Sequence, residues 1–291
     1  MDSLVNLLQV LITGVSIGGV YLLFGMGLTL IFGVINVINF AHGSFLVFSM
    51  YVSVLLYRYL SVDPYLSILI NMPLLFVLGY MTQRYLINRI LNHPHLNQLL
   101  LTMGILMILE NGMLFIFGPS PQTISVGYTA NALKFIGVSV SLPRVAALAM
   151  ALLLALGLFL FLSKTSLGRA VRASAMDQKG AVLVGINVQR IYAVAFGIGL
   201  ACVGACGSLV IPFFYASPYV GHTFLIIGFV AVIVGGLGSL KGAVIAGLLV
   251  GVIDTFGASY LPGTSGRMLI FIALIVVLLL KPTGLFNPAK S

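Results

Sequence analysis

Residues 164–190, KTSLGRAVRASAMDQKGAVLVGINVQR, form a basic stretch between two long apolar runs. This stretch, called the basic loop below, holds five basic residues and one acidic residue, a net +4 of the chain's total charge of +9. Charged side chains are costly inside a bilayer, so the basic loop must lie in water while its neighbours cross the membrane. In a chain that is otherwise apolar, such an element indicates a place where a soluble partner docks.

The composition is that of a membrane protein. Of the 291 residues, 60% are hydrophobic and 7% are charged, whereas soluble domains carry about 25% charged residues. So few charges cannot cover a soluble fold of this size, and lipid is therefore the expected solvent. The 14 basic residues outnumber the 5 acidic ones and lie mostly in gaps between apolar runs. This positive-inside pattern accounts for the basic excess without nucleic acid as a partner.

The apolar runs predict an all-α, polytopic integral membrane helical bundle with about 8–10 transmembrane helices, nine at face value. A span needs about 20 residues, so residues 5–56 hold at least two spans, interrupted by GVINVINFAHG (33–43). The segments on either side of GGLGSLKG (235–242) are short, and we expect two tight spans or a broken or tilted pair. One transmembrane domain, residues 1–291, is expected. The other spans are predicted at 65–81, 96–117, 142–162, 191–214, 224–237, 243–256 and 268–280.

The basic residues also predict the orientation. If the basic loop is cytoplasmic, Arg84, Arg89, Lys241 and Lys281 share its side when the spans alternate. The stretch 118–141 then faces the opposite side, and most of the Lys and Arg lie in the cytoplasm, as the positive-inside rule requires. The side of the N-terminus depends on the span count and stays open.

Within the basic loop, the spacing predicts a short helical hairpin. Ser166 is the expected N-cap, Gly180 interrupts the helical pattern, and a second short helix at 181–184 ends at Gly185. One face of the first helix, at steps of three and four residues, is formed by Leu167, Ala170, Val171, Ser174 and Ala175.

Two interpretations of this hairpin compete. The positive charge of the hairpin, taken by itself, is typical of an ordinary cytoplasmic loop between two membrane spans. The density of alanine and glycine instead favours a helix that packs into a groove on another protein, because a helix that only anchors to lipid would carry Trp, Phe or Leu on its apolar face.

Polar residues recur in the interruption at 33–43. Asn36, Asn39 and His42 are three apart, on one face of a helix, in apolar surroundings. Unsatisfied amides in hydrocarbon cost several kcal/mol, so these side chains must face protein or a water-filled path. Either they line a broken helix on the substrate route, or they hold packed helices together. For His42 alone, packing is the ordinary role.

Two acidic positions lie within predicted spans. Glu110, followed by Asn111, is a candidate for the translocation path because intramembrane acids mark functional sites by default. The alternative is a paired or interfacial carboxylate. Asp254 and Arg267 pose the same question, and a structural ion pair between them is possible.

Motifs for chemistry on a substrate do not occur. The sequence has no GxxxxGK[ST] run, so it does not bind ATP in a P-loop, and no cofactor is expected. Cys202 and Cys206 are four apart in an apolar run, which is typical of small packing residues, and a metal site would need more ligands than these two. We therefore expect no catalytic residue, no metal site and no enzymatic activity.

The chain resembles a known family over most of its length. Residues 166–199, SLGRAVRASAMDQKGAVLVGINVQRIYAVAFGIG, resemble the cytoplasmic coupling loop of permease subunits of ABC importers, and most closely that of the branched-chain amino acid permease family. NVINFAHGSF (36–45), GGLGSLKGAVIAGLLVG (235–251) and KPTGLFN (281–287) resemble further signatures of that family, in the same order. Gly180 departs from the pattern, since members more often carry a side chain there, and we expect a weaker second helix.

The resemblance implies that the basic loop inserts into a groove on a partner ATPase. The positions that match the coupling-loop pattern, and are therefore expected at that contact, are Gly168, Arg169, Ala170, Arg172, Ala173, Asp177, Gly185 and Ile186.

The expected function is that of a permease subunit of an ABC importer in the bacterial inner membrane. Its substrates would be branched-chain or other hydrophobic amino acids, with urea or short amides as the close alternative. The resemblance implies two cytoplasmic ATPase subunits that bind the ATP, a second homologous permease or a copy of this chain, and an external substrate-binding protein. A secondary transporter or channel working alone is the alternative from another class, but few coupling-ion groups are available for it.

Overall fold

The computed structural model describes residues 2–91, 93–135, 138–262 and 265–286. Nine longer helices in this part of the chain correspond to the nine predicted spans, which confirms the polytopic helical fold. They are α1 (Asp2–Ile35), α2 (His42–Leu60), α3 (Ile68–Met81), α4 (His95–Phe117), α5 (Leu142–Lys164), α8 (Val188–Val210), α9 (Val220–Gly235), α10 (Leu240–Tyr260) and α11 (Ser265–Leu280). The basic loop forms two short helices, α6 (Ser166–Met176) and α7 (Gln178–Leu183).

Six of these helices are long and apolar enough to cross a membrane, namely α1, α2, α4, α5, α8 and α10. Of the two segments that flank 235–242, α9 is short, with 16 residues, as expected. The expectation of a short α10 is wrong, because this helix has 21 residues. It begins earlier than its apolar run, where the Ser239 hydroxyl caps it by accepting a hydrogen bond from the Gly242 N–H at 3.2 Å.

A two-stranded sheet was not expected. β1 (Ala132–Phe135) pairs antiparallel with β2 (Val138–Ser141), with Ala132 opposite Ser141. The pattern VSVS alternates valine with serine at the period of a strand, and Val138 and Val140 are buried while Ser139 is exposed. This pair of strands is small, and helices make up the rest of the regular structure in the described residues.

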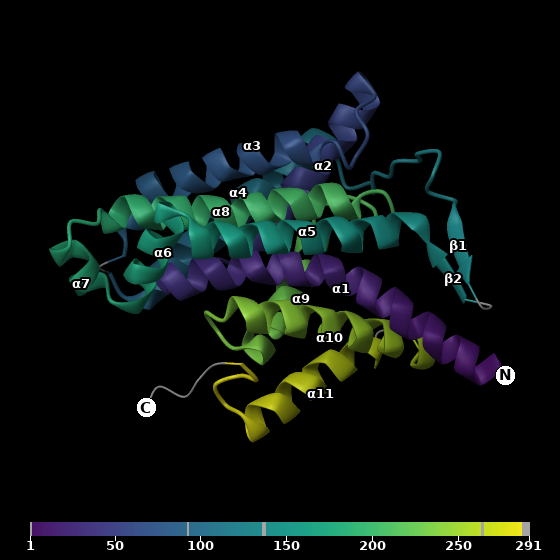
Figure 1. The fold of residues 1–291 in the computed structure, drawn as a ribbon. Helices are drawn as coiled ribbons and strands as arrows, with labels where there is room; N and C mark the ends of the chain where they lie inside the picture. Colours follow the sequence, from purple (N-terminus) through teal and green to yellow (C-terminus); the bar gives the residue numbers. More distant parts are fainter. Residues whose placement is uncertain (1, 92, 136–137, 263–264, 287–291) are drawn as a thin grey trace.

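The strands also locate the N-terminal part of the chain. The Gln9 side chain donates to the Ser139 carbonyl oxygen at 2.6 Å and accepts from the Ser139 N–H at 2.8 Å. The start of α1 therefore lies at the same end of the bundle as β1 and β2, and α6 and α7 lie at the opposite end (Figure 1). We call these the strand end and the basic-loop end. The start of α1, whose side of the membrane the sequence left open, thus lies on the side opposite the basic loop.

The centre of the bundle is formed by α1 and α8. In the most apolar 18-residue segment of α8, 89% of the residues are buried, whereas only 11% are buried in the corresponding segment of α4. α4 therefore lies at the edge of the bundle. α1 packs against α5, α8, α9 and α10, and Figure 1 shows it running between α5 on one side and α9 and α10 on the other.

Glycines bring α1 and α10 into backbone contact. A Cβ atom built on Gly251 of α10 would lie closer than 3.0 Å to the Gly18 Cα of α1, and one on Gly247 equally close to the Leu22 Cα. Gly14 of α1 faces the Val252 Cα in the same way. Small residues four apart on two facing helices are the usual basis of tight helix packing in membranes, because dispersion contacts replace the hydrophobic effect there.

Buried polar groups connect α2, α3 and α8. The Asn71 amide of α3 donates to the hydroxyls of Ser53 (2.8 Å) and Ser208 (2.7 Å). The Ser67 hydroxyl lies 2.9 Å from the Ser53 hydroxyl and 3.0 Å from that of Ser208. Ser49 donates to the Gly204 carbonyl oxygen of α8 at 2.7 Å. Each such bond between membrane helices stabilises their packing by about 1 kcal/mol.

The glycine contact can be tested by substitution. Gly251→Leu forces a side chain into the α1 backbone, and overpacking of this kind typically costs about 1–3 kcal/mol. We expect a clearly lower melting temperature of the protein in detergent, measured by fluorescence-detected size exclusion after heating. Gly104→Leu in α4 is the matched control, because a Cβ there meets nothing within 4 Å. Equal melting temperatures for the two variants would contradict the packing described.

Candidate functional site

Both helices of the basic loop have side-chain caps. The Thr165 hydroxyl accepts from the Gly168 N–H at 3.0 Å and begins α6, so the expectation that Ser166 is the N-cap is wrong by one residue. The Asp177 carboxylate accepts from the Lys179 N–H at 3.0 Å and begins α7. α7 is longer than the predicted 181–184 because this cap starts it at Gln178.

The end of α7 explains two of the motif positions. Gly185 has φ of 84°, the left-handed region that glycine favours. Its N–H donates to the Val182 carbonyl oxygen, and the Ile186 N–H donates to that of Ala181, both at 3.0 Å. This is a Schellman motif, so Gly185 and Ile186 end α7 and direct the chain toward α8.

Gly180 lies within α7 and does not interrupt it. A Cβ atom at this position would lie 2.6 Å from the Asp177 Oδ2 atom. The absence of a side chain at Gly180 therefore leaves room for the carboxylate that caps the helix.

The basic loop is attached firmly to α5. A Cβ atom on Gly168 would lie closer than 3.0 Å to the Leu162 Cα and to the Phe161 carbonyl oxygen, so α6 and α5 touch through their backbones. The Arg172 guanidinium donates to the Leu162 carbonyl oxygen, and that of Arg169 donates to the Lys164 carbonyl oxygen at 3.3 Å. Both arginines thus bind the C-terminal carbonyls of α5, where a cation is favoured.

The buried face of α6 differs from the predicted one. Gly168, Val171 and Ser174 are buried, whereas Leu167 and Ala175 are exposed. The close approach at Gly168 turns this line of residues toward α5, a constraint that spacing alone does not reveal. Ala170 and Ala173 are half-buried.

An apolar tip at the ends of α6 and α7 is the feature that sequence reasoning missed. Met176, Leu183 and Val184 are 88%, 86% and 76% exposed, and Lys179 beside them is exposed too. In the sequence, large apolar residues next to the ends of the two short helices indicate this surface. The charged and small residues of the basic loop drew attention away from them.

The interruption between α1 and α2 is a true break in the helices. Residues 36–41 are not helical, and Asn36 has φ of 57°. The expectation that Asn36, Asn39 and His42 share one helical face is therefore wrong. Asn36 is exposed, whereas Asn39 and His42 are 1% and 0% exposed. The left-handed turn at Asn36 separates it from the other two.

The break runs from the basic-loop end into the bundle, as far as the level of Phe24. The His42 ring packs edge-on against Phe24, with centroids 4.7 Å apart, and Phe24 lies eleven residues, or about 16 Å, before the end of α1. Gly43 packs against the Gly221 backbone at the start of α9. Non-helical backbone at such depth is tolerated only inside protein or beside a water-filled cavity.

Two polar atoms in the break lack partners. Asn39 Oδ1 accepts from the Ala41 N–H at 3.1 Å, but its Nδ2 atom is buried with no hydrogen bond. His42 Nε2 lies 3.3 Å from the Phe24 carbonyl oxygen, and its Nδ1 atom is buried and unpartnered. Buried polar groups are nearly always satisfied, so these two atoms are candidates for hydrogen bonds to a ligand or to water.

The acidic candidates are placed apart from the break. Glu110 Oε2 lies 2.7 Å from His222 Nε2 of α9, so it is a paired carboxylate. Asn111 is exposed and donates to the Met107 carbonyl oxygen of its own helix at 2.8 Å. α4 reaches the break through Thr102, whose hydroxyl donates to the Ile38 carbonyl oxygen at 3.3 Å. Glu110 is about 12 Å further along the helix.

The possible ion pair of Asp254 with Arg267 is not formed. Asp254 instead accepts a hydrogen bond from the Tyr21 hydroxyl at 2.7 Å, and no bridge within 4.0 Å joins it to Arg267 in the described structure. Both side chains line one cavity.

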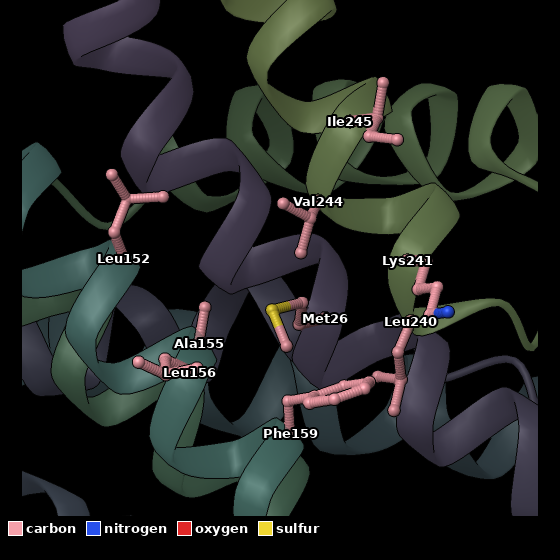
Figure 2. A pocket seen from close by; sticks show the side chains of 9 residues that line it. All are labelled: Met26, Leu152, Ala155, Leu156, Phe159, Leu240, Lys241, Val244 and Ile245. Carbon is pink, nitrogen blue, oxygen red and sulfur yellow. The ribbon is translucent and has the colours of Figure 1, made fainter.

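A groove of about 350 Å³ lies elsewhere, between α1, α5 and α10 (Figure 2). Met26 and Phe159 lie near its centre, and Lys241 directs its ammonium group away from Met26. The other lining residues are aliphatic. The groove can hold hydrocarbon such as a lipid chain, but it has no polar groups to orient a solute.

Residues 10–279 match the family described as "Branched-chain amino acid transport system / permease component". The chain belongs to this family. It is 30% identical to the high-affinity branched-chain amino acid transport system permease protein BraD of Pseudomonas aeruginosa, over 99% of this chain and 98% of BraD. It is 29% identical to the permease protein LivH of Escherichia coli (strain K12), over 98% and 97% of the two chains. No solved structure matches significantly.

Two of the family signatures, 235–251 and 281–287, meet next to the end of α1 at the basic-loop end of this permease. A Cβ atom on Gly33, just before the break, would lie 3.0 Å from the Gly238 Cα in the turn between α9 and α10. Gly284 packs against the Gly236 backbone of the same turn. The N–H groups of Leu285 and Phe286 donate to the Val234 and Gly235 carbonyl oxygens at 2.9 and 3.3 Å. The C-terminal signature thus completes the end of α9.

Replacing Asn39 separates a role in transport from a role in packing. Asn39→Leu removes the unpartnered Nδ2 atom together with Oδ1, which accepts from the Ala41 N–H. We therefore expect normal membrane insertion and a melting temperature only slightly below that of wild type, because one hydrogen bond contributes about 1 kcal/mol. Transport should fall at least about tenfold, since a hydrogen bond to the passing solute is lost. Thr29→Val is the control, because the Thr29 hydroxyl is another buried, unpartnered group, outside the break. Equal transport by the two variants would assign Asn39 to packing.

Proposed function

We propose that this chain is the permease subunit of an ABC importer that carries branched-chain or other hydrophobic amino acids across the bacterial inner membrane. It would act with two cytoplasmic ATPase subunits, a second homologous permease or a copy of itself, and an external substrate-binding protein. The observation that carries the proposal is the apolar tip, a large uncovered surface on a loop fixed rigidly to a membrane helix.

The apolar tip is more stable in a groove on another protein than exposed to water. Burying a Leu or Met side chain contributes about 1.5–3 kcal/mol, so Met176 and Leu183 are the side chains of the tip that gain most from docking. Lys179 adds a cation at the edge of the contact. Arg169 and Arg172 bind carbonyl oxygens of α5, so their role is to transmit force between the basic loop and α5. The small side chains of Ala170 and Ala173 let α6 pack closely against the partner.

Movement of the basic loop can be transmitted toward the break through α5 and through α8. The backbone contact at Gly168 connects it to α5, and the Asn187 side chain, which accepts from the Arg190 N–H at 3.1 Å, connects it to α8. A cavity of about 420 Å³ separates Val182 and Ile186 from Ile35, the last residue of α1. This space allows the loop to shift relative to the break.

In this scheme, ATP binding closes the ATPases, the basic loop follows, and the helices reorient around the path. Asn39 Nδ2 and His42 Nδ1 supply polar contacts for the solute inside the membrane. The energy comes from the partners, because the sequence has no P-loop. ATP would be bound by the partner subunits alone. A transporter or channel working alone is not favoured, because the chain's relatives are permease components of transport systems.

The substrate class rests on the relatives. BraD and LivH are named as branched-chain amino acid permeases, which favours leucine, isoleucine and valine over urea and short amides. The direction of transport and the membrane are part of the proposal, supported by the positive-inside pattern at the basic-loop end.

The apolar tip offers the sharpest test. Met176→Asp combined with Leu183→Asp should abolish leucine uptake in cells and reduce copurification of the ATPase by about tenfold or more. The melting temperature should not change, because both side chains are exposed. Substituting Arg169 and Arg172 would be less specific, since that also frees α6 from α5.

Ser166→Asp is the matched control, because it adds a charge to an exposed position of the same loop away from the tip. It should keep both uptake and copurification. Undiminished uptake and ATPase recovery in the double variant would refute the docking role.

A further inference from the structure

A cavity of about 120 Å³ lies in the strand-end half of the bundle, enclosed by α1, α8, α9, α10 and α11. It is separate from the break and from the basic loop. Its walls carry one carboxylate, from Asp254, and one guanidinium, from Arg267. The rest of the lining is aromatic or aliphatic apart from Thr223 and the Tyr21 hydroxyl.

The two charges face one space without neutralising each other. Asp254 Oδ2 is held by the Tyr21 hydroxyl at 2.7 Å, which fixes the carboxylate and leaves Oδ1 for another donor. Arg267 has no ion-pair partner within 4.0 Å in the described residues. Asp254 is half-buried and Arg267 is exposed, so the cavity has a carboxylate within the bundle and a guanidinium at its solvent-facing side. A ligand that carries both charges could pair with both groups.

A second arginine adds positive charge beside the cavity. Arg144 of α5 lies with its guanidinium carbon 5.7 Å from the centroid of the Phe213 ring, which lines the cavity. Its Nε atom is buried and has no hydrogen bond. Arg144 and Arg267 thus place two guanidinium groups beside the cavity, against the single carboxylate of Asp254.

The remaining walls select for an apolar group. The rings of Tyr21 and Phe214 meet Phe224 edge-on, with centroids 6.2 and 5.6 Å away. Ile17 and Ile227 complete the apolar surface. A cavity of about 150 Å³ accommodates benzene, so this slightly smaller one holds only the short aliphatic side chain of an amino acid, with the charged head beside the exposed Arg267, and it excludes an indole ring.

We propose that this cavity binds a zwitterionic aliphatic α-amino acid, with Asp254 accepting from the ammonium group and Arg267 donating to the carboxylate. The permease then selects substrate itself, and it rejects urea and uncharged amides because they leave both charges unpaired. This inference rests on the proposed transport function and adds the residues that recognise the substrate.

The test is direct binding of leucine to the permease, purified with its associated subunits in lipid nanodiscs without any binding protein. Radiolabelled leucine should bind measurably to the wild type. Asp254→Asn and Arg267→Gln should each weaken binding at least about tenfold, because each loses a hydrogen bond to a charged group. Arg84→Gln is the matched control, since it removes a guanidinium that lines a different cavity, beside Asn187 and Arg190, and it should bind as the wild type does.

Two leucine analogues separate the roles of the charges. Leucinamide lacks the carboxylate, so Arg267→Gln should leave its competition unchanged while Asp254→Asn weakens it. 4-Methylpentanoate lacks the ammonium group and should show the opposite pattern. This split is not produced by a general loss of folding, and Arg267→Lys should partly restore leucine binding.

Absence of leucine binding to the wild type up to millimolar concentrations would overturn the proposal. So would wild-type affinity in both charge variants, or identical effects of the two variants on both analogues. If leucine is still transported in an ATP-dependent manner in these cases, only the cavity assignment fails. If the wild-type assembly transports no leucine at all, the proposed function fails with it.

Discussion

Close approach of helix backbones at glycine is the constraint on which the rest of the structure depends. Lipid removes most of the hydrophobic driving force between helices, so packing must come from short-range contact. Gly18 and Gly251 allow it between α1 and α10, Gly27 and Gly199 between α1 and α8, and Gly43 between α2 and α9. These contacts make α1 the axis of the bundle and position both the break and the cavity beside Tyr21.

The same kind of contact joins the moving parts to the fixed ones. Gly168 ties the basic loop to α5, and Gly33 ties the start of the break to the turn after α9. A shift of the basic loop would therefore displace α5 with it. This scaffold leaves polar groups at two places: Asn39 and His42 at the break, and Asp254 and Arg267 on the walls of the cavity.

Much of the fold could be predicted from the sequence because apolar run length determines membrane spans directly. All nine predicted spans are helices, and the break was placed correctly. Helix caps were predicted less well, since Thr165 and Ser166 are equally good caps and only the contact at Gly168 decides between them. The exposure of Met176 and the shared cavity of Asp254 and Arg267 depend on tertiary packing, which spacing does not report. The roles of the site residues remain predictions.

The central claim is that this chain converts the ATP cycle of partner subunits into movement of an amino acid. Reconstitution of the permease with its partner subunits and binding protein into liposomes tests it most directly, with leucine flux followed as ATP is added on the side of the ATPases. The account predicts accumulation against a gradient that requires ATP hydrolysis and stops when the ATPases are omitted. Leucine flux that runs only down its gradient and is the same with and without the ATPases would contradict it.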